Sequence, residues 1–152
     1  MKTYFLKLND NAVIPEYQTE KSSGFDLVAA ERVLIPGGET MVVKTGLSII
    51  LPENTELQIR PRSGLSLKGP LRIANAPGTI DEDYVGKEIG IICWNTGRLS
   101  LRIEVGDRIA QGVVCPVIRT ENLEVDETTY NKLAESKRTS RNGGFGSTGN
   151  NV

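Results

Sequence analysis

The residue types that could do chemistry lie in five short blocks that contain Gly, and the chain has no His at all. The missing His removes Ser–His and Cys–His nucleophilic mechanisms, the commonest general base and the usual transition-metal ligand. Acid–base chemistry must therefore rest on carboxylates, Lys, Tyr or water. The segment 141–149 stands out because it combines four Gly with one Arg, one Phe and two hydroxyl side chains. These groups suit a polyphosphate and a flat ring, and the alternative is a frayed terminus.

A second block, residues 60–66, reads Arg-Pro-Arg-Ser-Gly-Leu-Ser. It places the guanidinium of Arg62, the hydroxyl of Ser63 and the backbone N–H of Gly64 at the start of an expected helical turn, residues 63–68. Helix starts and backbone nests bind anions, so this block is a candidate phosphate cradle. The alternative is a strand-end turn with a solvated Arg.

A third block, residues 75–86, reads Asn-Ala-Pro-Gly-Thr-Ile-Asp-Glu-Asp-Tyr-Val-Gly. Its Pro-Gly pair predicts a tight turn, and we expect a hairpin with exposed backbone groups at its mouth. Ile80 places an apolar neighbour beside Asp81. Desolvation raises the pKa of a carboxylate, so Asp81 is a candidate general base. The alternative is an acidic surface turn.

Two further blocks are less specific. In residues 23–27, Asp26 follows Gly-Phe and is either a turn aspartate or a ligand for a hydrated cation. In residues 106–112, Asp107 and Arg108 could pair with each other on the surface, while Gln111 faces either a ligand or solvent.

Taken together, these five blocks closely resemble the motifs of the trimeric dUTP diphosphatases, or dUTPases, in the same order from Ser23 to Gly149. The resemblance implies a jelly-roll-like β-barrel of the dUTPase-like β-clip type, assembled as a homotrimer with active sites at subunit interfaces. It also implies hydrolysis of dUTP to dUMP and diphosphate with Mg²⁺. That reaction limits uracil incorporation into DNA and supplies dUMP for thymidylate synthesis. The chain has no Walker-type phosphate loop.

The same resemblance assigns roles to individual residues. Asp81 is expected to orient and deprotonate the attacking water, and Asp26 to hold Mg²⁺ indirectly through water. The implied substrate-binding residues are Arg62, Ser63, Gly64, Asn75, Gly78, Thr79, Ile80, Tyr84, Gly90, Gln111, Arg141, Phe145, Gly146, Ser147 and Thr148.

By resemblance, the hairpin reads uracil through backbone groups and Asn75. Tyr84 lies against the deoxyribose and excludes a 2′-hydroxyl, and Gly90 closes the base pocket. Uracil and cytosine differ in donor and acceptor pattern, so mispaired buried groups would reject cytosine.

The phosphates are expected to meet residues 62–64 from a second subunit, with Gln111 near the α-phosphate. From a third subunit, Phe145 is expected to stack on uracil while Arg141, Ser147 and Thr148 engage the γ-phosphate.

Two departures from the family pattern concern local geometry. The segment from Arg141 to Phe145 is one residue shorter than Arg-Gly-x-Gly-Gly-Phe, so either Arg141 reaches the phosphate differently or Arg138 shares the contact. The spacing from Tyr84 to Asn95 is one residue longer than usual, which predicts a bulge near Lys87–Glu88.

Two alternatives belong to different functional classes. A related dCTP deaminase would use a Glu on the strand after the hairpin, but residues 91–94 read Ile-Ile-Cys-Trp. A catalytically silent nucleotide-binding module could share the fold. The presence of both Asp81 and Phe145 argues against this module.

The elements that must position these blocks are short strands. Apolar residues recur at every second position at 47–51, across Ser48 and Ile50, and apolar and polar residues alternate at 57–60 and most clearly at 99–105, with turn signals between the runs. This pattern predicts an all-β sandwich, jelly roll or barrel. Helical turns are expected only at 63–68 and 128–136.

Length and composition predict one ordinary globular domain of 152 residues, 38% hydrophobic and 24% charged. We expect a β-barrel core at 1–118, a polar arm at 119–140 that crosses to a neighbouring subunit, and a flexible Gly-rich lid at 141–152. A net charge of −1 and the lack of a long apolar run predict no nucleic-acid or membrane partner. A cytoplasmic location is the expected default. Cys93 and Cys115 lie in apolar runs, so we expect both to be buried and reduced.

Overall fold

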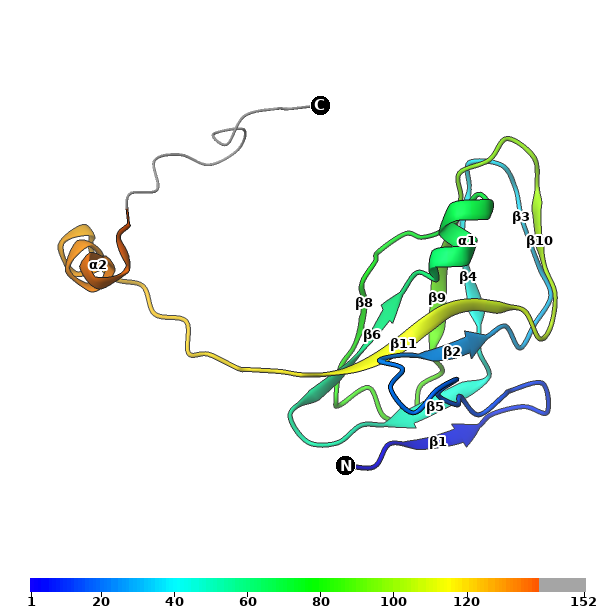
Figure 1. Cartoon of the computed structure of the whole chain (residues 1–152), viewed down its shortest axis with the longest axis horizontal. Coiled ribbons are helices and arrows are strands. Elements are labelled where there is room, and N and C mark those ends of the chain that lie inside the picture. Colours follow the sequence, from blue (N-terminus) through cyan, green and yellow to red (C-terminus); the bar gives the residue numbers. More distant parts are fainter. Residues whose placement is uncertain (140–152) are drawn as a thin grey trace. The chain divides into compact units, whose positions relative to one another are not determined.

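The computed structural model describes residues 1–139, and the chain divides into two compact units, residues 1–118 and 119–152. Figure 1 labels most of the elements along the chain. The strands are β1 (Tyr4–Lys7), β2 (Phe25–Val28), β3 (Val33–Ile35), β4 (Thr40–Lys44), β5 (Leu47–Ile50), β6 (Thr55–Arg60), β7 (Leu71–Ile73), β8 (Gly78–Ile80), β9 (Gly90–Asn95), β10 (Leu101–Ile103) and β11 (Arg108–Pro116). The helical segments are α1 (Ser63–Lys68), α2 (Glu127–Ala134) and a 3₁₀ turn, η1 (Glu135–Lys137).

The strands form four antiparallel sheets. The largest has the order β2-β11-β6-β8, and the others are β4-β9-β7, β1-β5 and β10-β3. In β6, Thr55, Leu57 and Ile59 are buried while the residues between them point outward, as the two-residue period of a strand requires. The all-β class expected from the sequence is confirmed.

One apolar core lies under all four sheets. Its fully buried members include Leu27 of β2, Ile35 of β3, Leu47 of β5, Leu57 of β6 and Ile91 of β9. Sheets that share one core enclose it as the layers of a jelly roll do. The short strands are therefore held by their common core.

The clearest alternating run in the sequence, residues 99–105, is a strand for only part of its length. β10 covers Leu101–Ile103 because its partner β3 has only three residues to pair with it. Leu99 beyond this ladder is 84% exposed. The alternating pattern correctly predicted that Ile103 faces the core and Arg102 faces outward, but it predicted too long a strand.

The prediction of a hairpin over residues 75–86 is wrong, because the strands on either side of the turn do not pair with each other. β7 pairs with β9, whereas β8 pairs with β6, so the segment around the cis Ala76–Pro77 bond carries the chain from one sheet to another. The bulge predicted near Lys87–Glu88 is also not observed. Both residues lie in the connection before β9, and the β4–β9 register runs without a shift from Gly90 to Trp94.

Both expected helical turns are present. α1 has the predicted bounds, and α2 begins one residue before the expected segment because Asp126 caps it by accepting the Thr129 N–H at 2.7 Å. Both cysteines are free; Cys93 is buried and Cys115 is partly exposed. Within residues 1–139, no helix is long and apolar enough to cross a membrane.

Candidate active site

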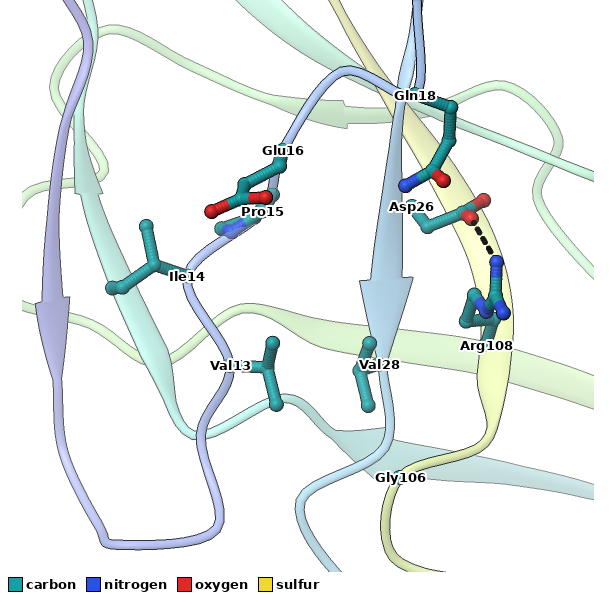
Figure 2. Close-up of a pocket in the computed structure, with 9 residues that line it drawn as sticks. All are labelled: Val13, Ile14, Pro15, Glu16, Gln18, Asp26, Val28, Gly106 and Arg108. Carbon is teal, nitrogen blue, oxygen red and sulfur yellow. Dashed lines mark hydrogen bonds and ion pairs between the residues drawn. The ribbon is translucent and has the colours of Figure 1, made fainter.

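The carboxylate of Asp26 on β2 is the centre of a cluster of charged side chains in the first unit. Its Oδ1 lies 2.7 Å from Nε of Arg62, and its Oδ2 lies 3.3 Å from Nη1 of Arg108. The Asp26 side chain is only 15% exposed, so these ion pairs are partly shielded from water. Figure 2 shows Asp26 and Arg108 facing each other from β2 and β11.

Strand pairing explains why residues far apart in sequence meet here. β11 lies between β2 and β6, which places Gln111 opposite both Asp26 and Arg60. The chain then turns at Pro61, whose carbonyl accepts a hydrogen bond from Nε2 of Gln111 at 2.9 Å, and α1 begins two residues later. Three of the five sequence blocks therefore converge on one place.

The segment before β2 can approach β11 closely because residue 24 is a glycine. A Cβ at Gly24 would lie 2.9 Å from Oε1 of Gln111 and 3.1 Å from the carbonyl oxygen of Gly112. A side chain at residue 24 would therefore displace Gln111. At Gly64, by contrast, a Cβ would meet no heavy atom within 4 Å, so the start of α1 is open.

The converging blocks line a cleft of about 610 Å³. Its polar lining combines the cations Arg62, Lys68 and Arg108 with hydroxyl and amide groups and one carboxylate. The expected site residues that line it are Asp26, Arg62, Ser63, Gly64 and Gln111. Excess positive charge beside hydroxyls and an exposed helix start suits a phosphate chain.

A second pocket, of about 410 Å³, adjoins this cleft and shares Gln18, Asp26 and Arg108 with it. Figure 2 shows its other wall, where Val13 and Val28 face each other below the polar residues.

Sequence reasoning missed two features of this cleft. Arg108 pairs with Asp26, whereas Asp107 accepts the backbone N–H of Glu104 at 2.9 Å, so the surface pair suggested for Asp107 and Arg108 is not the one observed. Lys68, at the end of α1, also lines the cleft and had no assigned role. Lys68 lies six residues after Arg62 at the other end of a short helix, and this spacing could have indicated that both cations line one cleft.

The expected base-reading residues lie elsewhere. Gly78, Thr79 and Ile80 form β8, beside β6, and Asn75 lies close to Gly78. None of the residues 75–84 lines the cleft around Asp26. The chain therefore holds these two groups apart.

Asp81 is exposed at the end of β8, although Ile80 beside it is buried. The shielding that Ile80 was expected to give is not provided within one subunit. Tyr84 is half-buried and packs against the core, while a Cβ at Gly90 would lie 2.7 Å from a methyl group of Val42. A side chain at residue 90 would therefore require the exposed Val42 side chain to shift.

The remaining expected site residues, Arg141, Phe145, Gly146, Ser147 and Thr148, lie outside the described residues. Within residues 1–139, no group of three or more Asp, Glu, Cys or His side chains could hold a metal ion. Asp26 alone could approach a cation there only in company with waters or a ligand's oxygens.

Comparison with known proteins gives a consistent result. The family model described as dUTPase matches residues 10–149. The deoxyuridine 5'-triphosphate nucleotidohydrolase of Crocosphaera subtropica is 51% identical over 149 residues, covering 98% of this chain and 99% of the relative. The protein of the same name from Wolinella succinogenes is 50% identical, covering 98% and 95%.

Solved structures agree with the fold. A variant dUTPase of Staphylococcus bacteriophage 80alpha, solved with dUpNHpp, has a TM-score of 0.83 at 28% identity, covering 97% of this chain and 98% of its own. A mutant dUTPase from phage phi11 of S. aureus, described with a structural Mg(II) ion, has a TM-score of 0.77 at 27% identity, covering 84% and 98%. With motifs, fold and nearly full-length relatives in agreement, this chain belongs to the dUTPase family.

Proposed function

We propose that this protein hydrolyses dUTP to dUMP and diphosphate by attack of water on the α-phosphorus. The observation that carries the proposal is the convergence of three dUTPase motifs on one cationic cleft around Asp26, Arg62 and Gln111. Phosphoryl transfer depends mainly on positioning and charge neutralisation, and this cleft offers groups for both.

In this proposal the cleft holds the triphosphate. Arg62 and Ser63 donate to phosphate oxygens, and the open backbone N–H of Gly64 adds a third donor from the start of α1. Gln111 lies near the α-phosphate, where its side chain is already oriented by its hydrogen bond to the Pro61 carbonyl.

The base is read by the segment that surrounds β8. Backbone groups of residues 78–80 and the Asn75 side chain meet the uracil edge, Tyr84 lies against the deoxyribose, and Gly90 lies beside the base. Asp81 orients the attacking water and takes its proton. An exposed carboxylate is available for this role once substrate and a neighbouring subunit cover it.

The separation of Asp81 from the Asp26 cleft supports a site shared between subunits. We propose a homotrimer in which one subunit supplies the base-reading segment, a second the phosphate cleft and a third the tail with Arg141, Phe145, Gly146, Ser147 and Thr148. The arm fits this assembly because Leu123 and Val125 are exposed, with fractions of 72% and 40%, and Ile118 just before the arm is 89% exposed. Apolar side chains exposed on an extended segment favour burial on another chain.

Mg²⁺ fits this site only through waters and phosphate oxygens, since Asp26 is a single carboxylate already paired with two Arg. Mg²⁺ commonly keeps several waters and takes direct ligands from substrate phosphates. When bound, it would neutralise charge on the phosphate chain. A cytoplasmic location stays a prediction.

The decisive experiment incubates the protein with Mg²⁺ and, separately, dUTP, dCTP, dTTP or UTP, and separates the products. We expect dUMP and diphosphate from dUTP alone. In water enriched in ¹⁸O, the label should enter dUMP and not diphosphate, because attack is at the α-phosphorus. Ammonia release from dCTP would favour a deaminase, and tight dUTP binding without turnover would favour a silent module. Either result overturns the proposal.

A further inference from the structure

Tyr84 is held between the turn that follows Asp81 and the segment that leads into β9. Its backbone N–H donates to the Asp81 carbonyl at 3.1 Å, and its hydroxyl donates to the backbone carbonyl of Glu88 at 3.3 Å. The Lys87 ammonium lies 5.1 Å from the ring centroid. The position of the Tyr84 hydroxyl therefore depends on where the backbone of Glu88 lies.

The Glu88 side chain ties that backbone to the turn between β4 and β5. Its Oε1 accepts the N–H of Gly46 at 2.9 Å, and its Oε2 lies 3.8 Å from Nζ of Lys44. Gly46 is buried with a φ of 67°, so its N–H needs an acceptor from within the protein. The Glu88 side chain is 25% exposed, which partly shields both contacts from water.

The next residue, Ile89, is held against the same turn by its own hydrogen bonds. The Thr45 hydroxyl donates to the Ile89 carbonyl at 2.8 Å, and the Ile89 N–H donates to the Leu47 carbonyl at 2.8 Å. The backbone of Ile89 is thus anchored by these two hydrogen bonds. The Glu88 carboxylate anchors the preceding residue, Glu88, whose carbonyl accepts the Tyr84 hydroxyl.

We infer that Glu88 is a positioning residue for sugar selection, which acts by fixing Tyr84. The inference rests on the proposed function, in which the Tyr84 ring lies against the deoxyribose. Without the Glu88 carboxylate, the segment 85–88 loses its side-chain anchor and the ring gains freedom to move. A displaced ring leaves room for a 2′-hydroxyl, so discrimination between dUTP and UTP falls.

The test compares Glu88→Ala and Glu88→Gln with Glu31→Ala. Glu31 is a matched control because its carboxylate accepts the Lys44 N–H at 3.0 Å on the same turn without contacting Tyr84. Glu88→Ala should raise KM for dUTP and raise the UTP-to-dUTP ratio of kcat/KM about tenfold, since small displacements at a site have large kinetic effects. Glu88→Gln, which keeps an acceptor for Gly46, should restore most of the ratio. An unchanged ratio in Glu88→Ala, or an equal change in Glu31→Ala, overturns the inference.

A second measurement separates this inference from the proposed function. Release of dUMP by the wild-type protein tests the function alone. In protein with ¹³C-labelled Tyr, the Tyr84 ring resonance, assigned with Tyr84→Phe, should shift in Glu88→Ala and stay in place in Glu31→Ala. A Tyr84 resonance that does not move in Glu88→Ala contradicts the inference whether or not dUTP is turned over.

Discussion

At the scale of single residues, the subunit gathers the groups that suit phosphates and keeps the candidate base away from them. Asp26, Arg62 and Gln111 meet in one cleft, while Asp81 is exposed at the end of β8. In the proposed reaction the cleft residues bind the phosphates and Asp81 takes a proton from water. Substitutions should therefore separate effects on binding from effects on turnover.

Replacing Asp81 tests the proposed base most directly. Asp81→Asn keeps the size and polarity of the side chain but cannot take a proton from water, so nucleotide binding should survive while kcat falls by about 100-fold or more. Single-turnover kinetics and dUTP-binding calorimetry measure the two quantities. Asp83→Asn is the control, because Asp83 is exposed in the same turn. Full turnover in Asp81→Asn would exclude Asp81 as the base.

The phosphate-binding part of the candidate site could be predicted residue by residue, whereas its ion pairs and strand neighbours could not. Asp26, Arg62 and Gln111 were identified from motif chemistry, and they do lie together. The pairing of Arg108 with Asp26 was not predictable, because it joins residues 82 positions apart through a strand register. Local proximity favoured Asp107 as the partner instead.

At the scale of elements, β6 lies between the two groups of site residues that one chain carries, and in the proposed trimer these two groups serve different active sites. It pairs with β11 on the phosphate side and with β8 on the base-reading side. Its alternating pattern predicted it as a strand, but its two neighbours were not predictable. The hairpin expectation failed because a Pro-Gly turn fixes a local change of direction and leaves the choice of partner strands to long-range packing.

Asn95, at the end of β9, is a fully buried polar side chain that holds two loops. Its Nδ2 donates to the carbonyls of Ile35, Pro36 and Leu99, and its Oδ1 accepts the Gly97 N–H. Asn95→Ala leaves these groups without their partner and should lower the free energy of unfolding by about 2 to 3 kcal/mol. Urea unfolding at one fixed protein concentration measures the change.

The control for Asn95 is Thr96→Ala. The Thr96 hydroxyl makes one exposed hydrogen bond, to the Pro70 carbonyl, so the loss should be a fraction of that for Asn95→Ala. Equal losses in both variants would contradict the expected contribution of the buried Asn95 hydrogen bonds.

The cap of α2 predicts how the arm responds to acid. Hydrogen bonds from Thr129 hold the pKa of Asp126 below its ordinary value of 3.8. A lowered folded-state pKa stabilises the helix above the unfolded pKa, and that contribution is lost as the pH falls through the folded value. The protection factor of the Thr129 amide, which is its slowing of exchange relative to an unfolded chain at the same pH, should therefore fall below about pH 4, and should be low at all pH values in Asp126→Ala. A Thr129 protection factor that stays constant through this pH range would rule out the cap.

At the scale of the whole molecule, the proposed homotrimer depends on surfaces that meet other copies of the chain. Composition and motifs predict one catalytic domain with an arm, whereas the contacts of the proposed trimer would be set by surfaces of different copies. The exposed apolar residues of the arm give a physical reason for contact between copies.

Two truncations separate the roles of arm and tail. Ending the chain after Ser140 removes the proposed γ-phosphate and stacking groups, so kcat should fall at least tenfold while light scattering still reports a trimer. Ending it after Ile118 also removes the arm and should lower the oligomeric state. A monomer after the shorter deletion would show that residues 141–152 hold the assembly together.

The double ion pair of Asp26 has a consequence for the order in which ligands arrive. Two guanidinium groups already balance this carboxylate, so the resting cleft offers a free cation little attraction. An incoming triphosphate competes for Arg62 and Arg108 and thereby returns negative charge to Asp26. Nucleotide and metal should thus enter as a preformed complex, and calorimetry should detect little Mg²⁺ uptake by the protein alone.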